Sequence, residues 1–481
     1  MSIVFLFYLL SLSFIDFVDK ISYKLIFLGE FMENKKVDLS EFYKSFLTIG
    51  VPLMVQQLIS SSLNFIDNLM IGRLGTNYIA AVGFANSVYR ILDLFLFGLC
   101  SGMGVFVAQY YGKRNFDMIR RILGKMIIAS FTLAIIFSTI TFFNAEKIIG
   151  IFTKEPKVLK IGVSYITKAL FSYTFYALSF STGFCLRAMG LTKFPMTSAS
   201  IGVAINTFFN YCLIYGNFGF PCLQEQGAAI ATVIARICEL TTIWLIVYKK
   251  DFNLKGKLNS YLNLPKDLIK EIVKISSPVF LTEMLWILGT VSLSVAYSKL
   301  GTTQAACVQI ADIITAISAI IFMGISNSAS VIIGHTIGKG DKNKVIIYSK
   351  KILQIAVIMG IFSLILVQLL TNNIVSLYHL PNEAHIMAIK TMRAAGIFVF
   401  LKMINWTLLI GLFRAGGDTK VAFCLDIFPL WFYAVPVAFI GAYFKIPVFY
   451  LVALADFSEF IKLIASIIRY KSLKWIKDVT V

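Results

Sequence analysis

The chain has 481 residues, of which 58% are hydrophobic and 14% aromatic, and its mean hydropathy is +0.81. A soluble domain of this size needs more polar side chains to cover its surface, so the composition excludes a soluble globular protein and indicates a membrane protein. The formal net charge of +19 would suggest a nucleic-acid partner in a soluble protein. Here the basic residues lie between apolar runs, and we expect no nucleic-acid binding.

The first 31 residues fit poorly with the rest of the chain. The run MSIVFLFYLLSLSFI is short for a membrane span, lacks a basic start and continues into Asp16 and Asp19. The segment MENKKVDLSEFYKSF, which begins at Met32, is a basic amphipathic lead-in to the first span. We therefore expect residues 1–45 to form an N-terminal extension and hypothesise that translation starts at Met32. An N-terminal peptide beginning before Met32 in the natural protein would remove this hypothesis.

Twelve apolar runs follow, each close to the roughly 20 residues that cross a hydrocarbon core of about 30 Å. No stretch between them is long enough for a separate soluble domain. We predict an all-α polytopic membrane protein. Its twelve transmembrane helices are expected at about 46–70, 79–108, 121–143, 160–187, 194–215, 227–248, 274–298, 305–334, 350–370, 387–413, 420–442 and 447–468.

Basic residues gather in alternate connections between the spans. Cytoplasmic loops carry an excess of Lys and Arg, so we expect both termini and the 249–274 connection to be cytoplasmic, in a bacterial cytoplasmic membrane. The 144–160 connection disagrees, because it should be external yet holds four lysines. The basic connections are 35–44, 112–125, 249–274, 339–351 and 469–477.

The second half of the sequence repeats the first. A shift of 226 residues matches Pro52 with Pro278, and a shift of 227 matches Arg187 with Arg414. Each repeat holds six spans, so both halves enter the membrane in the same sense and are related by a pseudo-twofold axis along the membrane normal.

The repeat divides the chain into two lobes. A cavity between two such lobes suits alternating access, whereas duplication for structure alone is the alternative interpretation. We expect an N-terminal lobe at 46–248, a cytoplasmic linker at 249–273, a C-terminal lobe at 274–468 and a cytoplasmic tail at 469–481.

Few residues suggest catalysis. The seven cysteines are scattered without C-x-x-C spacing, which indicates neither a disulfide framework nor a zinc site. His335, His379 and His385 lie near span ends without a spacing that would activate a nucleophile. The sequence also lacks the G-x-x-x-x-G-K-[ST] loop of an ATP-driven pump. We expect no enzyme activity, and a membrane-embedded enzyme is the alternative from another class.

Seven segments, in order and at the expected spans, resemble the multidrug and toxic compound extrusion (MATE) family, and its bacterial branches in particular. The resemblance covers residues 32 to about 470. The segments are PLMVQQ, FIDNLMIGRLGT, VAQYYGKRN, RAMGLTKFP, INTFFNYCLIYG, GAAIATVIAR and FRAGGDTK.

The resemblance implies twelve helices in a V of two six-helix lobes. It also implies a secondary active antiporter that exports cationic or amphiphilic drugs in exchange for Na⁺ or H⁺. We expect small organic cations and the lipid bilayer as partners, no cofactor beyond the coupling ion, and function as a monomer. By the same resemblance, Asp67 is a coupling-ion residue, and Asn206, Asn210 and Thr232 complete its site.

The residues themselves support a cation site. Asn206 and Asn210 are one helical turn apart and share a face, and their oxygens, with those of Asp67 and Thr232, suit a hard cation such as Na⁺. Alternatively, Asp67 exchanges a proton, because burial disfavours the charged form of a carboxyl group. An intramembrane carboxylate is a functional candidate by default. The structural alternative is that Asp67 only hydrogen-bonds Asn64, Asn206 or Asn210 between helices.

The C-terminal lobe carries a different acid. Leu293 replaces Asp67 in the repeat, whereas Glu283 stands where the first half has Gln57. By resemblance, Glu283 is a candidate for binding a substrate cation or a proton, against a structural role, and Gln57 and Asn64 are lesser candidates. The tenth span offers only Lys402 and Asn405 as partners, since it lacks the acid that some relatives have there.

Other charges within the spans divide into pairs and single residues. Arg90 with Asp93, Arg236 with Glu239 and Glu459 with Lys462 are spaced i, i+3, so we expect each pair to neutralise itself on one helix face. Arg187 and Arg414 end the fourth and tenth spans, and we expect them to anchor at the cytoplasmic face. Single charges that could line a cavity or pair across helices are Lys168, Asp312, Asp426 and Asp456.

A related flippase of lipid-linked sugars is the closest rival function. Such proteins tend to have two further spans and a cavity rich in Arg and Lys. Because the candidate residues here are acids and amides, we expect cation export instead.

Overall fold

The computed structural model describes residues 39–480 except 251, 257–260, 262 and 379, and the side chains of 62–65 are not described. The proposed start at Met32 and His379 therefore lie outside the described residues. Within the described part, every regular element is a helix. Ten helices there are long and apolar enough to span a membrane, so the protein is an all-α, multi-pass membrane protein.

Six rods in each half correspond to the twelve expected spans. The rods of the N-terminal half are α2 (Leu39–Gly72), α3 (Thr76–Gly112), α4 (Phe116–Phe143), α6 (Pro156–Ala188), α7 (Lys193–Tyr215) and α8 (Gln224–Lys250). Two short helices, α5 (Ala145–Phe152) and η1 (Asn217–Gly219), lie in its connections. Three rods of the C-terminal half are single helices, α10 (Lys266–Ser298), α11 (Thr302–Gly338) and α12 (Lys342–Ser376). The other three consist of consecutive elements: α13 (Asn382–Trp406) with η2 (Thr407–Arg414); α14 (Thr419–Pro429) with η3 (Leu430–Ala434) and α15 (Val435–Tyr443); and α16 (Val448–Asp456) with α17 (Ser458–Lys471).

Two expected spans are not among the ten helices that are both long and apolar enough to cross a membrane. One is α7, which carries Asn206 and Asn210 in its apolar sequence. The other is the α16–α17 rod, which a turn at Phe457 divides into two shorter helices. Both differences have local causes, and the six-plus-six arrangement is unchanged.

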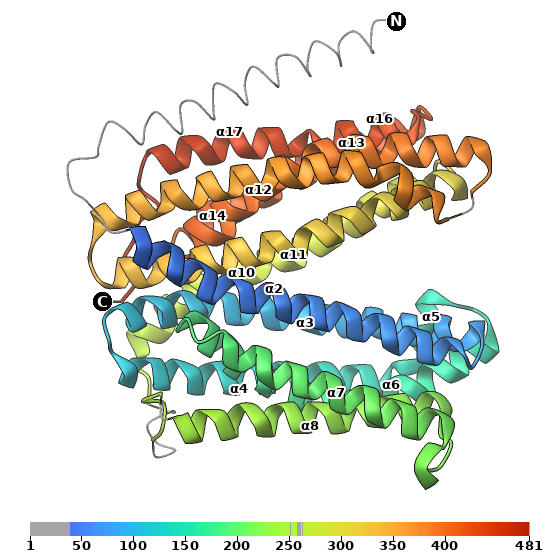
Figure 1. The fold of residues 1–481 in the computed structure, drawn as a ribbon, viewed down its shortest axis with the longest axis horizontal. Helices are drawn as coiled ribbons and strands as arrows, with labels where there is room; N and C mark the ends of the chain where they lie inside the picture. The colour runs from blue at the N-terminus through green and yellow to red at the C-terminus, as the bar shows by residue number, and fades with distance from the viewer. Residues whose placement is uncertain (1–38, 251, 257–260, 262, 379, 481) are drawn as a thin grey trace, which may run out of the picture.

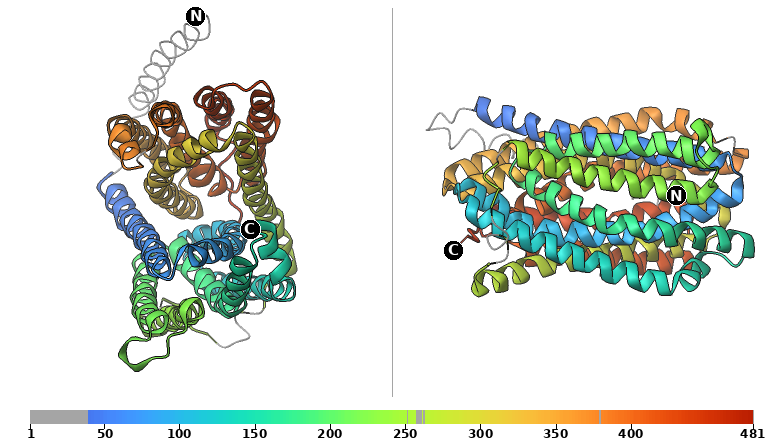
Figure 2. Two further views of the ribbon diagram at one scale, coloured as in Figure 1. Left: turned by 90° about the vertical axis from the view of Figure 1, so that its right-hand side faces the viewer. Right: turned by 90° about the horizontal axis from the view of Figure 1, so that it is seen from below.

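The two halves form two groups of roughly parallel helices. In Figure 1 the N-terminal half (α3–α8) lies below and the C-terminal half (α10–α17) above, with α2 crossing from one group to the other. Seen along the helices, the groups remain separate (Figure 2). The start of α2 and the C-terminus lie at the same end of the bundle, which we call the tail end.

The first helix of each half begins in the hydrophobic core of the other half. Phe42, Phe46 and Ile49 of α2 pack in a core of the C-terminal half with Phe322 and Tyr348. The residues 226 positions later, Leu268, Ile272 and Ile275 of α10, pack in a core of the N-terminal half. This exchange obeys the pseudo-twofold symmetry and ties the halves together near the tail end. The sequence repeat did not indicate it, because a repeat shows equivalence and not contact.

Close backbone contacts at the tail end are also symmetric. A Cβ atom at Gly112 would lie 2.2 Å from the His335 carbonyl oxygen, and one at Gly338 would lie 1.9 Å from that of Gln109. Any side chain there would force α3 and α11 apart. The repeated Gly-Lys pairs at these positions are therefore explained by helix packing between the halves.

A π turn explains the change of the repeat offset from 226 to 227. Helix α13 continues into η2, a π-helical segment that ends at Arg414, whereas the equivalent α6 is α-helical throughout. A π turn holds one more residue than an α turn. The extra residue in the second half is thus accommodated within the helix, and the matching Arg187 and Arg414 both remain at helix ends.

Candidate functional site

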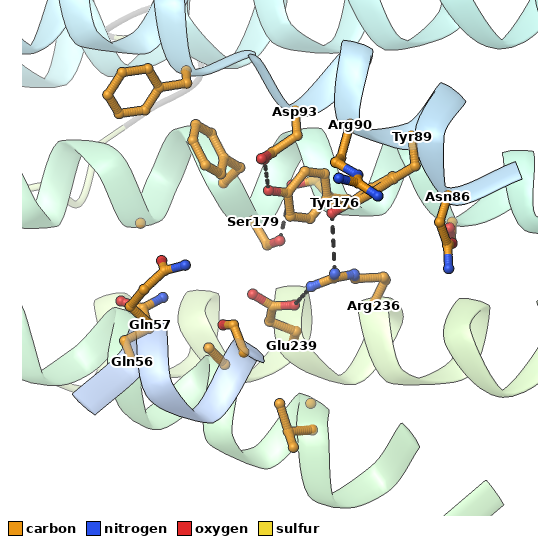
Figure 3. A pocket seen from close by; sticks show the side chains of 18 of the residues that line it. Gln56, Gln57, Asn86, Tyr89, Arg90, Asp93, Tyr176, Ser179, Arg236 and Glu239 are labelled. Carbon is orange, nitrogen blue, oxygen red and sulfur yellow. Dashed lines mark hydrogen bonds and ion pairs between the residues drawn. The ribbon is translucent and has the colours of Figure 1, made fainter. Parts of the chain in front are cut away.

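A cavity of about 800 Å³ lies between the two halves. Helices α2, α3, α6, α7 and α8 of the N-terminal half supply most of its lining, and α10, α11, α13, η2 and α14 supply the remainder. Residues from both halves therefore face one space, as alternating access requires. Figure 3 shows part of its polar lining, with Gln56 and Gln57 on one side and Arg90, Asp93 and Tyr176 on the other.

Asp67 belongs to a hydrogen-bonded cluster beside this cavity. The Asn210 side chain donates to Asp67 Oδ1 at 2.6 Å and to Asn206 Oδ1 at 2.9 Å. Asn206 in turn donates to Thr232 Oγ1 at 3.3 Å. The structure therefore brings together all four residues that the sequence assigned to one site, and each of them also lines the cavity.

The cluster leaves one buried oxygen free. Asn210 Oδ1 has no hydrogen-bond partner among the described residues, and Asn206 and Asn210 are both buried. A buried oxygen without a partner is costly, and a bound cation would satisfy it. The donor set of one carboxylate, amide oxygens and a hydroxyl suits a hard monovalent cation. The side chain of Asn64, a lesser candidate, lies outside the described part.

A second polar group joins α3, α6 and α8 across the cavity (Figure 3). Arg236 pairs with Glu239 at 2.6 Å, as its spacing predicted, and donates to the Tyr89 hydroxyl at 3.2 Å. Its guanidinium also lies over the Tyr176 ring, 4.5 Å from the centroid. The predicted Arg90–Asp93 pair is wrong: Asp93 instead accepts a hydrogen bond from the Tyr176 hydroxyl. No ion pair of Arg90 occurs in the described part of the chain.

Glu283 and Arg414 form a buried ion pair. Arg414 Nη1 donates to Glu283 Oε1 at 2.8 Å, and the two side chains are 4% and 11% exposed. The expectation that Arg414 anchors at the cytoplasmic face is therefore wrong, because the π turn η2 ends with this side chain inside the protein. Glu283 lines the cavity, but its charge is already compensated by a cation of the protein.

Arg187 also departs from the expected anchoring role. Its guanidinium lies over the Phe180 ring at 5.7 Å from the centroid. Phe180 precedes it by two helical turns, so the side chain extends back along α6 and lines the cavity. Because nothing in the sequence around Arg187 distinguishes an inward from an outward side chain, only the fold reveals this orientation.

Acids and lysines of the C-terminal half pair among themselves. Lys402 pairs with Asp456 at 2.9 Å, and Lys462 pairs with Asp426 at 2.8 Å and with Glu459 at 3.0 Å. Asn405 donates to Glu459 Oε2 at 2.8 Å. The i, i+3 pair of Glu459 and Lys462 is thus confirmed within a larger network. The tenth span has no acid of its own, and its Lys402 is neutralised by Asp456 of the last span.

Sequence reasoning missed the aromatic part of the site. The Tyr89 ring packs at a tilt against the rings of Tyr173 and Tyr176, with centroids 5.5 and 5.2 Å away, respectively. Tyrosines are common in membrane helices, so their spacing alone carries no signal. The local signal that existed was the pair of charges next to Tyr89 in α3, Arg90 and Asp93, which marked this part of the helix as polar.

Comparison with known proteins agrees with this architecture. The MatE family model matches residues 52–212 and 278–440, one match in each half. The chain is similar to the probable multidrug resistance protein YoeA of Bacillus subtilis, with 22% identity over 418 residues, which cover 85% of this chain and 89% of YoeA. It is also 26% identical over 398 residues to a probable multidrug resistance protein NorM of Agrobacterium fabrum, covering 81% and 84% of the two chains.

Solved structures share the fold at lower identity. A mutant of the Vibrio cholerae MATE transporter VcmN superposes with a TM-score of 0.82 at 18% identity, covering 91% of this chain and 99% of that one. A MOP superfamily transporter from Pyrococcus furiosus gives a TM-score of 0.80 at 18% identity, covering 90% and 96%. The six-plus-six arrangement is therefore an established transporter fold.

Proposed function

Since this chain belongs to the MATE family of membrane transporters, we propose that it is a secondary active antiporter. Its substrates would be cationic or amphiphilic drugs and toxic compounds, exported in exchange for Na⁺ or H⁺. The similar proteins that carry the name multidrug resistance protein support this assignment. A transporter accounts for the paired halves and the shared cavity better than a membrane-embedded enzyme does.

The observation that carries the proposal is the position of Asp67. This carboxylate lies in a membrane helix, lines the cavity and is bonded to an amide network that reaches α7 and α8. Burial of a carboxylate within a membrane-spanning helix costs free energy, so such residues usually mark functional sites. Its connection to both the cavity and a buried free oxygen supports a role in coupling.

The coupling step follows from this geometry. Uptake of a cation by Asp67 would neutralise the carboxylate and change its hydrogen bond with Asn210. For Na⁺, the oxygens of Asn206, Asn210 and Thr232 would complete the ligand set, whereas for H⁺ the carboxylate alone would suffice. Either event changes the charge that faces the cavity, and so the affinity for a charged substrate changes with it.

Export of an amphiphilic cation tests the proposal. Everted vesicles that contain the protein should accumulate ethidium in their lumen when a Na⁺ or a proton gradient is imposed separately, and proteoliposomes should transport it under the same gradients. Transport that persists after both gradients collapse would contradict the proposal. The gradient that drives transport identifies the coupling ion.

We further propose that the tail end of the bundle faces the cytoplasm of a bacterial cell and that one chain is the functional unit. The 249–274 connection holds seven lysines, whereas 216–226 holds none, which fits the positive-inside pattern. A single chain supplies both halves of the cavity lining. Labelling of single cysteines in 249–274 from the outside of intact cells would contradict this orientation.

A further inference from the structure

We propose that the C-terminal tail, residues 475–480, is a latch that holds the cavity closed at the tail end, and that Gln109 fastens it. The tail follows the last helix, α17, and so it belongs to neither set of six spans. Opening of the cavity towards the tail end requires the tail to leave Gln109. This role rests on the alternating access of the transporter proposed above, and it gives a conformational function to a segment outside the membrane helices.

Two equivalent hydrogen bonds join the halves at the tail end. Gln109 Nε2 of α3 donates to the Ala415 carbonyl oxygen at 3.0 Å, and His335 Nε2 of α11 donates to the Ala188 carbonyl oxygen at 2.8 Å. His335 follows Gln109 by 226 residues, and Ala415 follows Ala188 by 227, the two offsets of the sequence repeat. Each bond therefore joins the second span of one half to the end of the fourth span of the other.

The buried Gln109 side chain binds the tail as well as Ala415. It donates to the Lys477 carbonyl oxygen at 3.1 Å and accepts a hydrogen bond from the Val479 N–H at 2.8 Å. In the described part of the chain, His335 makes no comparable bond to the residues that follow α8, which are the equivalents of the tail. The tail is therefore an addition to one of two otherwise equivalent contacts.

The turn after η2 is shaped to receive the tail. A Cβ atom at Gly416 would clash with the Trp475 carbonyl oxygen, and one at Gly417 would clash with the Val479 side chain. Gly417 also has a φ of +76°, a conformation that favours glycine. In the first half, Met189 stands at the position of Gly416. The sequence of this turn thus makes room for a tail in the second half only.

Contacts to both halves hold the tail between them. Lys113 of α3 pairs with Asp478 at 3.0 Å, but these side chains are 35% and 46% exposed, so this pair contributes little. On the other side, the Lys477 N–H donates to the Gly416 carbonyl oxygen at 2.9 Å. The hydrogen bonds of the buried Gln109 and those of the turn therefore hold the tail most strongly.

The position of these bonds connects the tail to the cavity. Arg187 and Arg414 line the cavity, and each directly precedes the acceptor residue of one of the two equivalent bonds. Separation of the halves at this end breaks the bond between Gln109 and Ala415. Because the tail bonds to both partners of this contact, its bonds to one of them must break in the same step. The tail thus favours the closed arrangement, and its release shifts the equilibrium towards the open one.

The distance between the halves at the tail end tests the latch. Lys193 and Lys420 are equivalent exposed residues in the first turns of α7 and α14, one in each half. Cysteines at these two positions carry spin labels, in protein whose seven native cysteines are replaced by serine or alanine. Double electron–electron resonance in detergent measures the populations of closed and open conformers. We expect the closed conformer to dominate when the tail is intact.

The variant Gln109→His should release the tail while it keeps the contact between the halves. An imidazole makes the equivalent bond at His335, so the variant should retain the bond to Ala415 and lose those to the tail. The ratio of open to closed conformers should then rise about tenfold, as expected for the loss of two hydrogen bonds.

A second variant and a control separate release of the latch from general loosening. A chain that ends after Lys477 loses the groups that Gln109 and Lys113 bind at the end of the tail, but it keeps the buried Trp475. It should show the same rise in the open conformer. Lys474→Ala changes an exposed residue of the same segment and should give wild-type distances. Thermal unfolding of the labelled samples shows whether each variant is folded.

Three outcomes would overturn the latch. The first is an unchanged distance distribution in both tail variants, and the second is an equal rise of the open conformer in the control. The third is a shortened chain that does not fold, which would make the tail a structural element. If the variants open the tail end but the wild-type protein transports no ethidium under either gradient, the transport proposal fails and the latch stands.

Discussion

Gln109 of α3 accepts a hydrogen bond at 2.8 Å from the backbone N–H of Val479, a residue of the C-terminal tail. The Gln109 side chain also donates to the carbonyl oxygens of Ala415 (3.0 Å) and Lys477 (3.1 Å). Lys477 in turn pairs with Asp418 at 2.6 Å. The tail after α17 is therefore bound by both halves at once, and it joins them at the tail end of the bundle.

Loss of the tail's buried aromatic side chain should destabilise the protein. Trp475 is fully buried, packs beside Phe413 and Tyr470, and donates to the Tyr470 carbonyl oxygen at 3.2 Å. Trp475→Ala should cost about 3–5 kcal/mol, as expected for deletion of a buried aromatic side chain. Thermal unfolding in detergent measures the effect, with the exposed Lys474→Ala as control. Equal Tm values for the two variants would show that the tail contributes little.

The tail should also give stability a dependence on pH. Partial burial by itself would raise the pKa of Asp478, but hydrogen bonds from Thr480 and the nearby Lys113 ammonium outweigh it and hold that pKa below its usual range. Because the folded-state pKa is lowered, the stabilisation is complete above the ordinary aspartate pKa of about 3.9 and disappears as pH falls through the folded value. The Tm difference between wild type and Asp478→Asn should be present at pH 7 and shrink below pH of about 4. A difference that is constant across this range would exclude the ionisation of Asp478 as its cause.

Asp67→Asn should abolish gradient-driven efflux while leaving the fold intact. The new amide oxygen can still accept the hydrogen bond from Asn210, and a buried neutral amide costs less than a buried charge. Membrane expression and Tm should therefore stay near wild-type values. Ethidium efflux under an imposed gradient is the measurement. Full efflux by this variant would mean that coupling belongs to another carboxylate.

Asn210→Ala should separate Na⁺ coupling from proton coupling. The substitution removes an oxygen from the Asp67 cluster but leaves the carboxylate in place. If Na⁺ is the coupling ion, half-maximal efflux should require about tenfold more Na⁺, because each ligand lost from such a site weakens binding. If the ion is H⁺, the dependence on pH should change little. Asn327→Ala is the matched control, since Asn327 lines the same cavity from α11 and donates to the Met323 carbonyl oxygen.

Removal of the charge on Glu283 should affect stability more than substrate range. The resemblance made Glu283 a candidate for binding a substrate cation or a proton, but this carboxylate holds Arg414 in a buried pair. Loss of one partner leaves a buried charge uncompensated and costs about 3–5 kcal/mol. The double variant Glu283→Gln/Arg414→Gln should recover most of that loss in Tm. A stable single variant with altered drug selectivity would restore the original interpretation.

Several features of the fold could be predicted from local sequence patterns. The lengths of the apolar runs predicted the twelve spans, the internal repeat predicted the two halves, and the i, i+4 spacing predicted that Asn206 and Asn210 share one helix face. The same reasoning found the Arg236–Glu239 and Glu459–Lys462 pairs, because residues three or four apart in a helix are neighbours whatever the rest of the chain does.

Tertiary structure decided which groups meet across helices. Arg90 and Asp93 have the spacing of a pair, yet the Tyr176 hydroxyl, 83 residues from Asp93, bonds to the carboxylate. Glu283 and Arg414 are 131 residues apart, and Gln109 and Val479 are 370 apart. A helix sequence fixes which residues share a face, but the neighbour that this face contacts depends on how distant helices pack. Which charged groups near the cavity are paired depends on these contacts between helices, so the pairing could not be predicted from the sequence.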